Sequence, residues 1–176
     1  HLKREDRLTR VDVIERGHDL AQQLAAADPK NTQAQRDLGT IFERLGLVSQ
    51  TLGSVEEAND WYEKMLKGKE ILAGGDPKDF LAQRETAVTY DHLGDVSQQL
   101  GNVPAARDFY QKALEIRQQL AAADPKNAQA QRDLSISFMQ LGDVSQQMGN
   151  VRVARDTELV LAEGEDVDHH PVVELF

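Results

Sequence analysis

Residues 93–103 read LGDVSQQLGNV, and nearly the same letters return at residues 141–151 as LGDVSQQMGNV. A more diverged copy, LGLVSQTLGSV, stands at residues 45–55. The spacing between copies is constant, because 93 − 45 and 141 − 93 are both 48. A fixed period of this size is typical of stacked repeats, so the chain is expected to fold as a solenoid.

A second repeated block has the same period. The stretch from Leu24 to Leu38 recurs from Leu120 to Leu134 with one difference, Thr32 against Ala128. Each block carries Asp-Pro, which favours a helix start, because Asp can cap a helix and Pro is tolerated in its first turn. A glycine, Gly53, Gly101 or Gly149, stands where a helix end needs a left-handed residue. Ser54 with Glu57 three residues later predicts a capping box, and Asn102 and Asn150 are the equivalent N-caps. Each unit therefore predicts two helices: first helices over about 31–52, 79–100 and 127–148, and second helices over about 55–73 and 103–123.

The predicted fold class is all-α, a superhelix of antiparallel helix pairs. A repeat domain is expected over residues 1–161, with repeats at 31–73, 79–123 and 127–161 and a tail or short cap at 162–176. Residues 3–26 fall in register with a second helix and have no first helix, so they predict an orphan second helix. The aromatic pair is lost from Thr157 onward, as in the atypical units that end repeat arrays. Because the chain begins at His1, we also expect it to be a piece of a longer product.

The composition excludes several functions. The chain has 20 Lys and Arg against 30 Asp and Glu, a net charge of −10, which argues against nucleic acid and against an anionic membrane as partner. No apolar run approaches the roughly 18 residues of a membrane span, and no signal peptide precedes the repeats, so a cytoplasmic location is expected. Cysteine is absent, which excludes disulfides and thiolate chemistry.

No residue pattern points to catalysis. We find no nucleophile–base constellation, so the chain is not expected to be an enzyme or to use a cofactor. His169 and His170, near Asp166 and Asp168, are metal-ligand types without the spacing of a structural site, and no metal site is predicted. The aromatic residues of the second helices lie at core spacing and are expected to pack inside: Trp61, Tyr62, Phe109 and Tyr110.

The repeated residues resemble the tetratricopeptide (TPR) repeat. The middle unit carries the family pattern as Tyr90, Leu93-Gly94, Ser97, Gly101, Ala106, Tyr110 and Ala113; the first as Phe42, Leu45-Gly46, Ser49, Gly53, Ala58 and Tyr62, with Met65 last; the third as Phe138, Leu141-Gly142, Ser145, Gly149 and Ala154. The resemblance spans about 31–161. The period of 48 exceeds the usual 34 and is similar to long-helix variants such as those in kinesin light chain. Gly94 and Ala106 are expected to let two helices approach closely, with Tyr90 and Tyr110 filling the space beside them.

The resemblance implies a concave groove lined by the first helix of each pair. Its peptide-binding positions would be Thr40, Glu43, Leu47, Gln50, Val88, Asp91, Asp95, Gln98, Ile136, Met139, Asp143 and Gln146. Several are acidic, and the Lys and Asn that other family members use to hold a terminal carboxylate are absent. The expected ligand is a basic or mixed-charge peptide or helix. The alternative is that these acids form a solvated face.

Three arginines recur with the repeat: Arg36, Arg84 and Arg132. They could form a row at the groove's edge that holds a carboxylate bidentately. The alternative, which we favour, is a ladder of ion pairs between units.

The sequence as a whole predicts a protein–protein interaction module. One alternative is a scaffold that self-assembles as a homo-oligomer, through the orphan end helix or the apolar tail Val172–Phe176. Another is a regulatory segment of a larger signalling enzyme.

Overall fold

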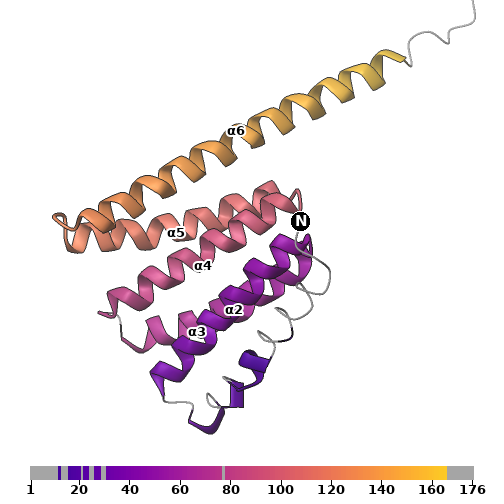
Figure 1. The fold of residues 1–176 in the computed structure, drawn as a ribbon. Coiled ribbons are helices and arrows are strands. Elements are labelled where there is room, and N and C mark those ends of the chain that lie inside the picture. The colour runs from indigo at the N-terminus through magenta and orange to yellow at the C-terminus, as the bar shows by residue number, and fades with distance from the viewer. Residues whose placement is uncertain are drawn as a thin grey trace, which may run out of the picture.

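The computed structural model describes residues 12, 16–20, 22–23, 26–28, 31–76 and 78–165, with side chains described as far as residue 149 except that of Ala73. The elements after residue 31 are all helices, so the all-α prediction is confirmed. They are α2 (Thr32–Leu52), α3 (Val55–Gly75), α4 (Phe80–Gln99), α5 (Val103–Ala123) and α6 (Ala128–Glu165). α2 packs on α3 and α4 on α5 as hairpins, and α3 contacts α4 as α5 contacts α6, which gives the stack in Figure 1.

The helix starts use polar caps, though not all of the expected ones. Asn31, Asp79 and Asn102 each accept a hydrogen bond from the backbone N–H three residues on, at 3.0, 2.9 and 3.2 Å. These bonds satisfy donors that have no partner inside the helix. Asp76 of the Asp-Pro pair instead accepts from the N–H of Lys78 in the preceding turn. Ser54 stands at the N-cap of α3 without a side-chain capping bond, so the predicted capping box with Glu57 is not formed.

The glycine of each Leu-Gly pair lets a tyrosine of the second helix lie against the first-helix backbone. A Cβ atom built on Gly46 would lie 2.5 Å from the Tyr62 ring, and one built on Gly94 would collide with the ring of Tyr110 in the same way. Leu93, Ala58 and Ala106 are fully buried next to these rings. Glycine is required at both positions because side chains pack at close to crystal density there.

The turns after the first two first-helices are confirmed. Gly53 (φ 82°) and Gly101 (φ 75°) are left-handed, a conformation that glycine adopts without steric cost. The expected third turn is wrong, because α6 continues through Gly149 and Asn150 to Glu165, and Figure 1 shows it extending past the stack.

The physical reason for the missing turn lies in the second helix that was expected after it. The tyrosine position of the third unit is 110 + 48 = 158, which is Glu158. A Cβ built on Gly142 meets no atom of the described residues within 4 Å. Without a ring to pack over Gly142, a turn at Gly149 would bury little apolar surface and gain little free energy from it.

Both chain ends are described only in part. Residues 12, 16–20, 22–23 and 26–27 are helical, and the His18 ring centroid lies 5.4 Å from each of the Phe42 and Trp61 ring centroids. The rest of the expected orphan helix lies outside the described residues, as does the tail from 166 onward with His169, His170 and Val172–Phe176. Residues 162–165, predicted as tail, belong to α6. No helix in the described part of the chain is long and apolar enough to cross a membrane.

Candidate interaction surface

The first helices α2, α4 and α6 lie next to one another along the stack, and we call their outward side the first-helix face. Polar pairs join them at a constant offset of 49: Arg36 with Glu85, Arg84 with Asp133, and Gln98 with Gln147. Glu43 and His92, with 92 − 43 also 49, approach to 3.6 Å. The offset is one repeat period plus one residue. The same two repeat positions therefore face each other at each junction between first helices.

The predicted groove residues lie on this face with unequal exposure. On α6 all four are exposed, Met139 at 62% and Ile136 at 38%. On α2, Thr40 and Leu47 are exposed, while Glu43 and Gln50 are half-buried. All four α4 residues are half-buried, namely Val88, Asp91, Asp95 and Gln98. α4 is the most covered because a first helix lies on each side of it.

The two predicted acids of α4 are already engaged inside the protein. Asp91 pairs with both terminal nitrogens of Arg117, whose side chain is only 4% exposed, and Arg117 also donates to Ser137 at 2.7 Å. Burial raises the pKa of Asp91 even though Arg117 acts to lower it. Asp95 accepts a hydrogen bond from the Tyr110 hydroxyl at 2.7 Å. Asp91 therefore joins α4 to α5 and, through Arg117, to α6, while Asp95 joins α4 to α5, so both carboxylates already have partners inside the protein.

Two of the three arginines form the ion-pair ladder. Arg36 binds Asp79 at 2.6 Å and Glu85 at 3.3 Å, Lys69 also reaches Glu85 at 2.8 Å, and Arg84 binds Asp133 at 2.6 Å. Arg132 is exposed and has no ion pair among the described residues. Arg36 and Arg84 thus join neighbouring units, which is the ion-pair alternative that the repeat spacing favoured.

Two of the ladder carboxylates, Asp79 and Asp133, have pKa values that are shifted toward the charged form. Burial raises the pKa of Asp133, but hydrogen bonds from Arg84 and Gln129 outweigh it and leave the pKa below its ordinary value. The backbone N–H of Ala82 lowers the pKa of Asp79, and Arg36 lowers it further. Hydrogen bonds to a carboxylate favour its ionised form, so Asp79 and Asp133 are charged at neutral pH.

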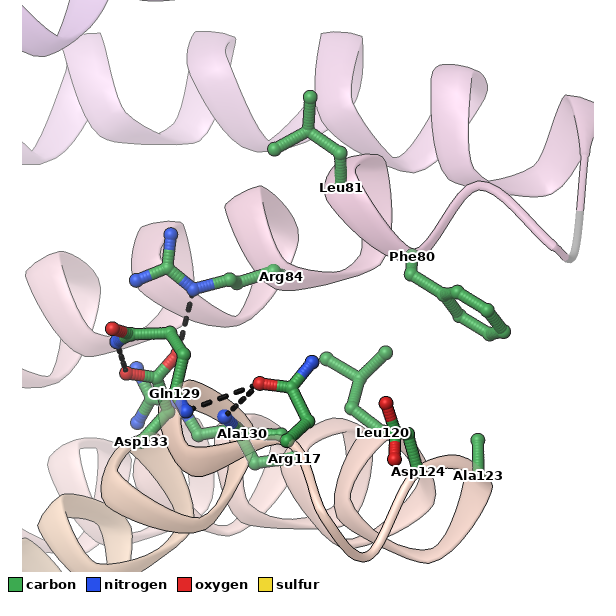
Figure 2. Close-up of a pocket in the computed structure, with 11 residues that line it drawn as sticks. Phe80, Leu81, Arg84, Arg117, Leu120, Ala123, Asp124, Gln129, Ala130 and Asp133 are labelled. Atoms are coloured by element: carbon green, nitrogen blue, oxygen red, sulfur yellow. Dashed lines mark hydrogen bonds and ion pairs between the residues drawn. The ribbon is translucent and has the colours of Figure 1, made fainter.

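A hollow that the sequence did not predict lies at the junction of α4, α5 and α6, shown in Figure 2. Its volume is about 250 Å³, slightly below the roughly 300–1,000 Å³ of typical small-molecule pockets. Its apolar lining is Phe80, Leu81, Leu120, Ala123 and Ala130, and its charged lining is Arg84, Arg117, Asp124 and Asp133.

A second hollow, of about 670 Å³, repeats the first one unit earlier. Its lining includes Leu72 and Asp76, which lie 48 residues before Leu120 and Asp124. The sequence held one signal for the first hollow. The pair Phe80-Leu81 is apolar where the other units have Thr32-Gln33 and Ala128-Gln129, and both residues are more than half exposed.

No metal chemistry is indicated on this surface. Within the described ranges, no group of three or more His, Asp or Glu side chains could hold a metal ion.

Trp61 and Phe109 pack at the edge of the core, while Tyr62 and Tyr110 are buried, so the prediction of a packing role for the four aromatics is confirmed.

Stacked hairpins with tyrosine-over-glycine contacts define a helical-repeat protein. Residues 85–146, from α4 into α6, match the family described as tetratricopeptide repeat. This match covers 62 of the 176 residues and supports a TPR-type repeat, as the motifs predicted, and it supports a general role in protein–protein interaction.

Two further comparisons add no function. No curated protein matches the chain. Among solved structures it is similar to the one titled "Crystal structure of BtubC (BKLC) from P. vanneervenii", with 16% identity and a TM-score of 0.38, over 97% of this chain and 96% of that chain.

Proposed function

We propose that this chain is an interaction module that binds a basic or mixed-charge peptide or helix across the first-helix face. The observation that carries the proposal is the pattern of exposed side chains there. Leu47 is 44% exposed and Met139 62%, and the exposed Asp143 lies one helical turn beyond Met139 on α6. Apolar anchors beside an acid suit a partner that carries both apolar and cationic side chains.

The charge of the protein supports the same ligand. The chain carries a net charge of −10, which attracts a cationic partner over a distance that salt shortens. Helices packed through a core and an ion-pair ladder offer a preformed surface, so little ordering is needed on binding. Binding of this kind requires no catalysis by the chain.

The roles of the groove residues divide on this proposal. The exposed ones contact the ligand, whereas Asp91 and Asp95, with internal partners, position the helices. Substituting Asp91 would leave the buried guanidinium of Arg117 without its carboxylate, a change that generally costs several kcal/mol of stability. Asp143, exposed on α6, is therefore the residue to substitute.

The test uses two labelled helical peptides with one leucine pattern and either lysine or glutamate at the other positions. The lysine peptide should bind more tightly, and its affinity should fall as salt rises from about 50 to about 300 mM. Asp143→Lys should weaken it about three- to tenfold, since an exposed charge contributes up to about 1 kcal/mol. Asp108→Lys, an equal charge change at an exposed residue of α5, is the matched control. Tighter binding of the glutamate peptide, or equal effects of the two variants, would contradict the proposal.

A further inference from the structure

The ion-pair ladder has an unfilled position at each end. Each rung joins an arginine of one first helix to an acid of the next at an offset of 49, as in Arg36–Glu85 and Arg84–Asp133. From Arg132 the same step leads to position 181 of a fourth unit. Since 181 − 3 × 48 is 37, the equivalent residue in the first unit is Asp37.

Arg132 and Asp37 are each the free half of such a rung. Both are exposed, and no ion pair reaches either from the described part of the chain. Asp37 accepts from Gln33 at 2.8 Å, just as Asp133 accepts from Gln129 at 2.6 Å. Asp37 thus has the same local support as Asp133 and lacks only the arginine of a preceding unit.

The apolar side of α6 is open in the same sense. Phe138 occupies the position of Phe42 and Tyr90, which are 9% and 8% exposed, yet Phe138 is 54% exposed. A Cβ on Gly142 meets open space among the described residues, whereas Gly46 and Gly94 lie under tyrosine rings. The first half of α6 is therefore a first helix that no second helix of the described chain covers, because its own continuation runs straight on.

The segment around residues 16–27 has the register of the missing second helix. His18 stands 48 residues before Leu66, which packs against the core from α3, and the His18 ring lies against Phe42 of α2 as a preceding second helix would. Leu20 stands 96 residues before Ile116, which packs against the cluster of Tyr90 from α5, and Leu20 is 67% exposed. An apolar side chain at this register suits the site beside Phe138, the equivalent of Tyr90.

We propose that a second copy of this chain stacks head to tail on α6. Its helical segment around residues 16–20 takes the second-helix place beside Phe138, and its α2 becomes the next first helix. Asp37 of the second copy then closes the rung with Arg132 of the first. The charge pairing and the 48-residue register then continue across the junction as they do between units within the chain. Each copy keeps one open end, so the contact is heterologous and builds rings or filaments. The stack extends the first-helix face, and it does not depend on that face binding a peptide.

The test is sedimentation velocity of the 176-residue chain over rising concentration. The weight-average sedimentation coefficient should rise with concentration. Arg132→Glu and Asp37→Lys should each weaken association about tenfold, because each turns an attraction into a repulsion of like charges. Joined in one chain, the two substitutions should restore association, as should an equimolar mixture of the single variants. Arg107→Glu and Asp108→Lys, both on the exposed side of α5, are the matched controls and should leave it unchanged.

Three results would overturn the proposal. One is a chain that stays monomeric at every concentration. Another is association that persists in both Arg132→Glu and Asp37→Lys. This outcome includes the case in which only deletion of residues 172–176 abolishes association. The third is failure of the doubly reversed chain to recover while its circular dichroism shows it folded. Asp37, Arg107, Asp108 and Arg132 are all exposed, so none of these substitutions should unfold the chain. Circular dichroism and urea unfolding of each variant separate loss of folding from loss of contact.

Discussion

Each complete hairpin is closed by one tyrosine over one glycine. Tyr62 covers Gly46 and Tyr110 covers Gly94, with both rings at most 2% exposed. The Tyr62 hydroxyl then donates to Gln50 at 2.8 Å, and the Tyr110 hydroxyl to Asp95 at 2.7 Å. One side chain fills the space above a bare backbone and reaches the polar side of the first helix. Burial raises the pKa of Tyr110, and Asp95 raises it further, so the phenol stays a donor.

Gly94→Ala should destabilise the chain because its methyl group would collide with the ring of Tyr110. Overpacking of this kind costs about 1–3 kcal/mol, offset in part by the better helix propensity of alanine. Gly142→Ala is the matched control: the same substitution in the same repeat position, where the Cβ meets open space. It should be neutral or stabilise by up to about 1 kcal/mol. Urea unfolding compares the two, and an equal loss in both would contradict the packing argument.

α6 resembles α2 and α4 up to Gly149, and the difference lies in the residues that follow this glycine. The three first helices share Leu-Gly and a terminal glycine, yet only α2 and α4 end there. Val103–Ala123 returns along α4 because Ala106, Tyr110 and Ala113 can be buried against it. The end of the helix is therefore set by tertiary packing, because packing of an apolar face supplies most helical stability in proteins.

Replacing Thr157 by Phe and Glu158 by Tyr should break α6 at Gly149. The restored aromatic pair could pack over Phe138 and Gly142, and burying each ring contributes about 1.5–3 kcal/mol. Small-angle scattering should report a smaller radius of gyration, and the variant should also lose head-to-tail association, because its own second helix fills the site. Thr157→Ser with Glu158→Gln is the control that removes the charge without adding rings. Unchanged dimensions in the aromatic variant would show that packing over Gly142 does not set the end of α6.

The described helices form two hairpins, α2–α3 and α4–α5, followed by α6, and core contacts and the ion-pair ladder join each to the next. Lys69 and Arg36 converge on Glu85, while Arg84 holds Asp133. Stability in such arrays is close to a sum of units and of contacts between neighbours. The ladder is a contact between neighbouring units. Loss of its charges should therefore weaken the packing of one unit on the next and leave the helix pairing within each hairpin intact.

Acid should weaken the stack as the ladder carboxylates become protonated. The folded-state pKa of Asp133 and Asp79 is lowered, so each contributes stability above its unfolded pKa of about 3.9 and loses it as pH falls through the lower folded value. The urea midpoint should therefore drop from about pH 4 downward. Asp91, with a raised pKa, acts in the opposite direction, since its contribution is present below the unfolded pKa and is lost as pH rises.

The variant that isolates this effect is Asp133→Asn. It should be less stable than the parent at about pH 7, and the difference should shrink as the pH falls through the lowered folded-state pKa of Asp133, because the carboxylate of the parent then becomes protonated. Asp108→Asn, at an exposed position of α5, should follow the parent at every pH. A constant difference between the Asp133 variant and the parent would show that the carboxylate's charge does not contribute.

The sequence by itself determined the period, the helix pairs of the first two units and the residues that meet inside them. Leu93, Gly94, Ala106 and Tyr110 could be assigned because their partners lie within one hairpin and recur at fixed spacing. The ladder was one of two open interpretations, because equal spacing shows that the arginines share a face but not what lies opposite.

Only the tertiary structure decided the use of Asp91 and the end of the array. Asp91 meets Arg117, 26 residues away on another helix, and such a partner depends on which helix lies alongside. Gly149 is followed by Asn-Val, as Gly101 is, and differs only in having Met148 before it where Gly101 has Leu100, yet it lies within the continuous helix α6. A left-handed glycine permits a turn, but the packing of the returning helix supplies the free energy that makes it form.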